Sequence, residues 1–161
     1  MAVPTLEQQD RAINNIIAWL RTYHDRPILP MNYYRAVPSL ILEHGRAWYI
    51  GERTFAGRRA TRKQCYMNSY TLADRNPRMI YVEGWCWKEN NHFEHAWCID
   101  PDGQVIDPTL RDANGYYGIP FRWEYVLATA IKTEVYGIIS NSDSGLLTAP
   151  AETFIHDIAR S

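Results

Sequence analysis

The sequence contains little cysteine, no long hydrophobic run and no strong excess of charge of either sign. Among its 161 residues are only three cysteines, an odd number at scattered positions: Cys65, Cys86 and Cys98. Small secreted proteins that are cross-linked by disulfides contain an even number of cysteines at a higher density. The count therefore favours reduced thiols in a cytoplasmic protein.

No run of about 18 apolar residues occurs, so no membrane-spanning helix is expected. A signal peptide would need an apolar core near the N-terminus, where the sequence instead has Pro4, Glu7, Asp10 and Arg11. We expect a soluble, unprocessed chain with no membrane partner.

Charge is nearly balanced, with 17 Lys and Arg residues against 18 Asp and Glu and a formal net charge of -1. This balance argues against a bulk electrostatic attraction to nucleic acid. The 46% hydrophobic and 22% charged residues are typical of a globular protein and not of a disordered one. No internal repeat and no linker rich in Gly, Ser or Pro divides the chain, so residues 1–161 are expected to form a single domain.

The N-terminal segment, residues 6–24, is predicted to be an amphipathic helix. Thr5 and Gln8 form a capping-box pattern before it, and apolar residues recur near helical spacing at Leu6, Ile13, Ile16, Ile17 and Leu20. Three prolines then predict an extended connection: Pro27, Pro30 and Pro38. A short strand at 48–50 should follow and end at Gly51.

Alternating side chains predict three strands in the middle of the chain. They cover residues 79–87, 93–99 and 104–107, separated by turn signals at 89–91 and 100–103. This arrangement is typical of an antiparallel meander. Further along, we expect an aromatic turn at 116–121 that fills the core, a helix at 123–131, a strand at 135–139, a loop at 141–145 and a short C-terminal helix after Pro150.

Cys65 is predicted to lie at the start of a helix. Thr61 and Gln64 form a second capping-box pattern, which places the helix start near Arg62 and Cys65 in the first turn. Unpaired backbone N–H groups and the positive end of the helix dipole favour a thiolate there, and Arg62 and Lys63 act in the same direction. The alternative is that Cys65 is simply a small buried residue of this helix.

His95 and Asp107 are predicted to meet across adjacent strands. A type I turn with a left-handed bulge at Gly103 would shift the register by one residue and place Asp107 opposite Trp97. His95 would then be a diagonal neighbour on the same face, at about 7 to 8 Å between backbones. Singly, a strand histidine is usually a hydrogen-bonded core residue and an Asp before Pro is usually a cap.

Taken together, Cys65, His95 and Asp107 have the residue types of a nucleophile, its base and an orienting group. His95-Ala96-Trp97, the turn containing Gly103 and Asp107-Pro108-Thr109 resemble the His and Asp motifs of the transglutaminase-like branch of the papain-like cysteine hydrolases. Cys65 followed by Tyr66 is similar to the cysteine motif of that family. The resemblance covers about residues 60–121. Lys63-Gln64 replace the small residue often found before the cysteine, which implies a compact or divergent version.

The resemblance implies an α+β fold in which the cysteine-bearing helix packs on an antiparallel sheet. It also implies a thioester intermediate formed from a peptide or protein amide substrate, without a metal or other cofactor. Water as the acceptor would make the protein a peptidase or amidase, and an amine would make it a transglutaminase. We expect the backbone N–H of Cys65 to stabilise the oxyanion, with Gln64 or Asn68 as second donor. Gln64 is equally explained as a cap, and Asn68 as a partner of a backbone group.

Three other interpretations remain open. Zinc ligation by His92, His95, Cys98 and Cys86 is disfavoured because strand residues three apart face opposite sides. A basic loop contains Arg53, Arg58, Arg59, Arg62 and Lys63. It could bind phosphate or nucleic acid, form a solvated surface, or border the cleft and select an acidic substrate or partner. Finally, the chain could be a non-catalytic binding protein that uses the same scaffold and cleft to hold a protein partner.

Overall fold

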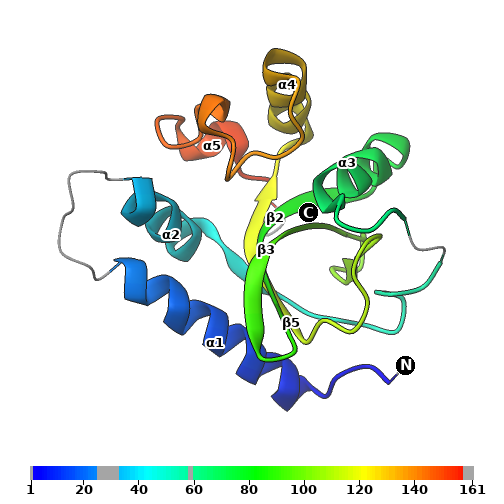
Figure 1. The fold of residues 1–161 in the computed structure, drawn as a ribbon. Coiled ribbons are helices and arrows are strands. Elements are labelled where there is room, and N and C mark those ends of the chain that lie inside the picture. The colour runs from blue at the N-terminus through cyan, green and yellow to red at the C-terminus, as the bar shows by residue number, and fades with distance from the viewer. Residues whose placement is uncertain (1, 25–32, 58–59, 158–161) are drawn as a thin grey trace.

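The computed structural model describes residues 2–24, 33–57 and 60–157, and in them the chain has a mixed α+β fold. A curved antiparallel sheet has the strand order β1-β5-β2-β3-β4 (Figure 1). Its strands are β1 (Arg46–Trp48), β2 (Ile80–Lys88), β3 (Asn91–Ile99), β4 (Val105–Ile106) and β5 (Gly115–Phe121). The predicted α+β class and the β2-β3-β4 meander are confirmed.

Helices pack around this sheet (Figure 1). The largest hydrophobic cluster is built from residues of these helices and of the strands. The helices are α1 (Leu6–His24), α2 (Tyr33–His44), α3 (Cys65–Arg75), α4 (Trp123–Thr133) and α5 (Ala151–Phe154), with a 3-10 turn at Ser142–Ser144. The cysteine-bearing helix α3 packs against β3 and β2, as expected. Across the described residues, no helix has both the length and the apolarity that a bilayer crossing requires.

The predicted N-terminal helix and its capping box are confirmed in α1. The backbone N–H of Thr5 donates to Gln8 Oε1 at 2.8 Å, and the N–H of Gln8 donates to Thr5 Oγ1 at 3.2 Å. These reciprocal bonds satisfy two donors that a helix start leaves without partners. Ile13, Ile16 and Leu20 of the apolar stripe are buried in the main hydrophobic cluster, whereas Leu6 at the start of the helix is exposed.

The extended connection expected around Pro38 is wrong, because Pro38 lies inside α2. A proline at an interior helix position costs roughly 3 kcal/mol. Burial of Val37 and Ile41 in the main hydrophobic cluster contributes about 1.5 to 3 kcal/mol each and offsets that cost. Pro27 and Pro30 lie outside the described residues. The strand predicted at 48–50 is present with the same length but lies two residues earlier, at Arg46–Trp48.

The two faces of the sheet contact different hydrophobic clusters. Along β2, Tyr81 and Trp85 pack into the cluster under the helices, whereas Val82 and Cys86 pack into a second cluster. Trp97 of β3 belongs to the second cluster, which loop residues such as Leu110 cover. The alternation in the sequence therefore reflects two buried faces, and His95 points to the same side as Trp97.

Two predictions for the second half of the chain are wrong. The expected aromatic turn at 116–121 is strand β5, which lies between β1 and β2 and is buried along its whole length. The expected strand at 135–139 is a loop, because the N–H groups of Ile138 and Ile139 donate to the carboxylate of Glu83 instead of to a strand. Burial raises the pKa of Glu83 to about 7, although these N–H bonds and Tyr81 act to lower it.

The contact between β2 and β5 depends on two glycines that face each other. Gly84 pairs directly with Gly118, and a β-carbon on Gly84 would collide with the Tyr117 carbonyl oxygen and the Gly118 α-carbon. The strands can therefore approach and curve here only because both positions lack side chains.

We predict that Gly84→Ala lowers the free energy of unfolding by at least about 2 kcal/mol, because the backbone atoms that it meets cannot move aside. Gly103→Ala is the comparator: nothing lies near its β-carbon, but its φ of 80° costs a non-glycine residue roughly 1 kcal/mol. Urea denaturation followed by circular dichroism measures both. If Gly103→Ala lowered the free energy of unfolding as much as Gly84→Ala, or more, the close approach of β2 and β5 would be contradicted.

Candidate active site

Cys65 is the first residue of α3, three residues later than the helix start expected from the sequence. Lys63 has a φ of 61°, a left-handed conformation that a right-handed helix cannot contain, so the helix begins after it. The predicted capping box is wrong: Gln64 occupies the N-cap position without a side-chain cap bond. Cys65 consequently lies in the first turn as predicted, where backbone N–H groups lack intrahelical partners.

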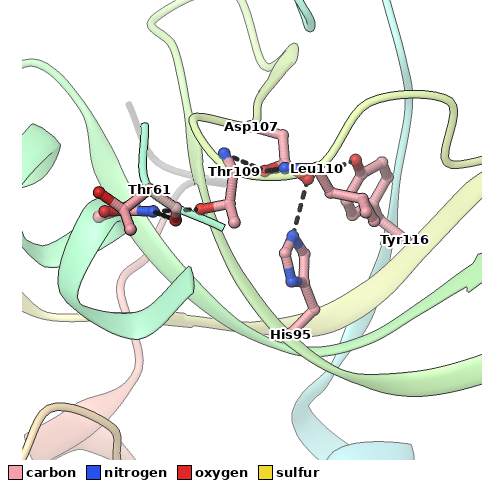
Figure 2. Close-up of polar contacts among 7 residues, drawn as sticks. Thr61, His95, Asp107, Thr109, Leu110 and Tyr116 are labelled. Carbon is pink, nitrogen blue, oxygen red and sulfur yellow. Dashed lines mark hydrogen bonds and ion pairs between the residues drawn. The ribbon is translucent and has the colours of Figure 1, made fainter. Parts of the chain in front are cut away.

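Asn68, one turn into α3, connects two loops. Its amide nitrogen donates to the carbonyl oxygen of Thr61 at 2.8 Å and to Thr109 Oγ1 at 2.9 Å (Figure 2). These bonds tie the segment before α3 to the segment after Asp107, so a role as oxyanion donor would require one of them to break. The side chain of Gln64 is exposed at the helix start.

The turn between β3 and β4 has the geometry predicted from its sequence. Gly103 has a φ of 80° and its N–H donates to the carbonyl oxygen of Asp100 at 3.0 Å. The register then pairs Cys98 with Ile106, which places Asp107 opposite Trp97. The predicted bulge is confirmed, and it brings Asp107 to the face of the sheet that carries His95.

His95 and Asp107 form a buried, hydrogen-bonded pair, as predicted. His95 Nε2 lies 2.8 Å from Asp107 Oδ2, with the two residues 3% and 6% exposed (Figure 2). Because Nε2 is engaged by the carboxylate, the second ring nitrogen, Nδ1, is left for another partner. Ring contacts with Phe93, Trp97 and Tyr116 further restrict the imidazole.

Asp107 receives three further hydrogen bonds that fix its carboxylate. Oδ1 accepts from the backbone N–H groups of Thr109 and Leu110, both at 2.9 Å, and Oδ2 accepts from the hydroxyl of Tyr116 at 2.7 Å (Figure 2). Burial by itself would raise the pKa of Asp107, but the charge and hydrogen bond of His95 and these donors lower it below its ordinary value. Asp107 is therefore held as a carboxylate.

The sequence analysis missed the contribution of Tyr116, which it placed in a core-filling turn. The side chain reaches Asp107 only because β5 lies beside β2 in the sheet, a long-range pairing with no local signal. A tyrosine in an aromatic stretch is more often a core residue, and here it is both buried and a hydrogen-bond donor.

The pKa of His95 is raised to about 10. Burial is the largest single contribution and lowers it, whereas the charge and hydrogen bond of Asp107 raise it. A side-chain hydrogen bond and the charge of Cys65 raise it further. His95 consequently lies between Asp107 and Cys65 and holds its proton at neutral pH.

The sheet leaves room for Cys65 beside His95. Within the described residues, β4 pairs only with Cys98 and Ile99, so the edge of β3 next to His95 carries no neighbouring strand. The start of α3 occupies this position. Cys65 and His95 both line a cavity of about 500 Å³, together with Lys63, Phe93 and Thr109 among others.

The other two cysteines are not placed for the same chemistry. Cys86 and Cys98 are fully buried, and burial raises the pKa of both thiols. Cys98 Sγ donates to the carbonyl oxygen of Ser69 at 3.3 Å. In the part of the chain that the structure describes, no group of three or more His, Cys, Asp or Glu residues is arranged to hold a metal ion.

We predict that Asp107→Asn lowers the pKa of His95 from about 10, because the charge of the carboxylate then no longer opposes the effect of burial and only Cys65 still does. Ring nitrogen chemical shifts measured against pH test this, with His92 as an internal reference. Because the pKa of His95 is raised in the folded state, its protonation stabilises the fold most below pH 6.5. This stabilisation is lost as the pH rises toward 10. The stability deficit of Asp107→Asn should therefore narrow over that range, and an unchanged His95 titration would contradict the role of Asp107.

Comparison of the chain with protein-family models, curated proteins and solved structures found no match. Any functional conclusion has to come from the residues and their geometry. The feature that most constrains function is the placement of Cys65, His95 and Asp107 at one cavity.

Proposed function

We propose that the protein is a cysteine-dependent amide hydrolase or acyltransferase that forms a thioester on Cys65. The observation that carries this proposal is the position of His95 between two partners. Its Nε2 is held by Asp107 at 2.8 Å, and Cys65 hydrogen-bonds to its side chain at the wall of a cavity. A nucleophile, a base and an orienting group in this order activate a thiol.

The reactive form in this mechanism is a Cys65 thiolate paired with a His95 imidazolium. The proton of the thiol resides on Nδ1 of His95, the ring nitrogen that does not face Asp107. The raised pKa of His95 supports this state, since an imidazolium with a pKa of about 10 keeps its proton at neutral pH. The Asp107 carboxylate balances the charge that remains on the ring.

Acylation then needs no additional group. The sulfur of Cys65 attacks the amide carbonyl carbon, and the resulting oxyanion lies near the first turn of α3, where the Cys65 N–H has no intrahelical partner. When the C–N bond breaks, His95 donates its Nδ1 proton to the departing amine. The products of this half-reaction are a free amine and an S-acyl Cys65.

Deacylation reverses the proton movement. Neutral His95 accepts a proton from the acceptor as its oxygen or nitrogen attacks the thioester carbon, and the C–S bond breaks to restore the thiolate–imidazolium pair. Water as the acceptor releases a carboxylic acid, and an amine releases a new amide. The cavity of about 500 Å³ has room for a substrate side chain and for either acceptor.

We predict that p-nitrophenyl acetate, an activated acyl donor, acetylates Cys65 and is turned over repeatedly by the protein. The release of p-nitrophenol reports turnover, and intact-mass measurement with neutral hydroxylamine identifies the thioester. Cys65→Ser and His95→Gln should both reduce turnover by at least about 100-fold, a loss typical of removing a nucleophile or base. A single stoichiometric acetylation without turnover would favour a non-catalytic binding protein.

We also predict that iodoacetamide labels Cys65 at about pH 6 more than roughly 10-fold faster than N-acetylcysteine, whose thiol is almost entirely protonated there. Cys86 and Cys98 should remain unlabelled in the folded protein, because both are fully buried. Peptide mapping after timed quenching gives the three rates.

His95→Gln should reduce the Cys65 labelling rate to that of the free thiol, since the imidazolium partner is lost. Continued protection of Cys86 and Cys98 in this variant shows that its fold is intact. Equal, slow labelling of all three thiols in the wild-type protein would rule out an activated Cys65.

A further inference from the structure

The cavity in front of Cys65 has more positive than negative side chains on its walls. Arg62, Lys63 and Lys88 line it, against Glu94 as the acidic member. Burial raises the pKa of Glu94, and its Oε2 accepts a hydrogen bond from the Tyr66 hydroxyl at 3.5 Å. The thiolate and imidazolium of the reactive pair cancel one another, so these side chains determine the net potential that a substrate meets.

Two of the three cations have no acidic partner among the residues that the structure describes. Lys88 Nζ lies 3.6 Å from Asp112 Oδ2. By contrast, Arg62 and Lys63 are exposed and form no ion pair with any residue that the structure describes. Their charges are therefore available to a ligand in the cavity.

The basic loop expected from the sequence divides into parts with different surroundings. Arg53 Nη2 lies 2.6 Å from Asp102 Oδ2 and 3.3 Å from Asp100 Oδ2, so acidic residues of the β3–β4 turn neutralise it. Arg58 and Arg59 lie outside the described residues. Only Arg62 and Lys63 are seen to border the cavity.

The backbone at Lys63 gives an independent reason to regard its side chain as functional. Its φ of 61° is a left-handed conformation that glycine adopts readily and a long side chain adopts only at a cost. A lysine nevertheless occupies this position, two residues before Cys65, and it lines the cavity. The side chain offers a positive charge that glycine could not.

We infer that the preferred substrate is a peptide amide with an aspartate or glutamate side chain next to the scissile bond, and that Arg62 and Lys63 bind this carboxylate. This inference rests on the proposed function for its reaction but names the substrate class separately. Side-chain cations at the rim of a cavity attract an anionic ligand, and the attraction weakens with ionic strength.

The test compares alkylation of Cys65 by iodoacetate, an anion, with alkylation by neutral iodoacetamide at low ionic strength. The ratio of the two rate constants measures attraction of the anion and cancels changes in the reactivity of the thiol. In the variant Arg62→Gln/Lys63→Gln this ratio should fall about fivefold, as expected for removing two charges at roughly 8 Å in water. Added salt should move the wild-type ratio toward that of the variant.

Lys132→Gln is the control, because it removes an exposed positive charge on α4 that does not line the cavity. Its ratio should equal that of the wild type. An unchanged ratio in Arg62→Gln/Lys63→Gln would overturn the inference of an acidic substrate. The iodoacetamide rate alone would still report on activation of Cys65, so failure of the proposed function is recognised separately.

A second comparison distinguishes a peptide-borne carboxylate from a small free anion. N-chloroacetyl-glutamate amide and N-chloroacetyl-glutamine amide have the same shape and differ in one charge. In the wild type, the glutamate probe should label Cys65 about fivefold faster than the glutamine probe, the same factor as expected for iodoacetate. This preference should be lost in Arg62→Gln/Lys63→Gln. Equal labelling by the two probes would overturn the assignment of an acidic peptide even if iodoacetate retained its advantage.

Discussion

The hydrogen bond between His95 and Asp107 is the interaction on which the geometry of the site depends. It is buried, and an unpaired carboxylate there would cost several kcal/mol. The protein offsets that cost with donors from three directions: the imidazole on β3, two backbone N–H groups after β4, and the hydroxyl of Tyr116 on β5. The same donors that stabilise the carboxylate of Asp107 also fix its orientation. They thereby determine the tautomer and the tilt of the His95 ring.

The open edge of β3 determines where the thiol can be placed. β4 is only two residues long and pairs with the end of β3, so no strand among the described residues pairs with that side of the segment that carries His95. The first turn of α3 occupies this space and presents Cys65 to the ring. Asn68 joins the loop before the helix to the loop after Asp107, which links the position of Cys65 to that of Asp107.

The sequence predicted features that depend on local chemistry. The bulge at Gly103 needs a glycine after Pro101-Asp102, and the cap of α1 needs Thr5 and Gln8 at a fixed spacing, so both could be found without tertiary information. The meeting of His95 and Asp107 followed from the alternation of strand residues and that one bulge.

Features that depend on long-range burial could not be predicted in this way. β5 was predicted as a turn because its segment contains Gly118 and Pro120, whereas its burial on both faces decides its structure. The start of α3 was misplaced because nothing in the sequence signals the left-handed backbone of Lys63. Tyr116 acquired its role only through the pairing of distant strands, and the fold family implied by the sequence resemblance remains a prediction.

Cys65 stands apart from the network that holds the site together. Asp107, Tyr116, Thr109 and Asn68 are joined to one another or to His95 by hydrogen bonds that shape the loops, whereas the contact of the thiol is with the imidazole. Replacing that one sulfur-bearing side chain would leave the walls and the charged rim in place. In evolutionary terms, a single codon would separate the catalyst that we propose from a receptor with the same cavity.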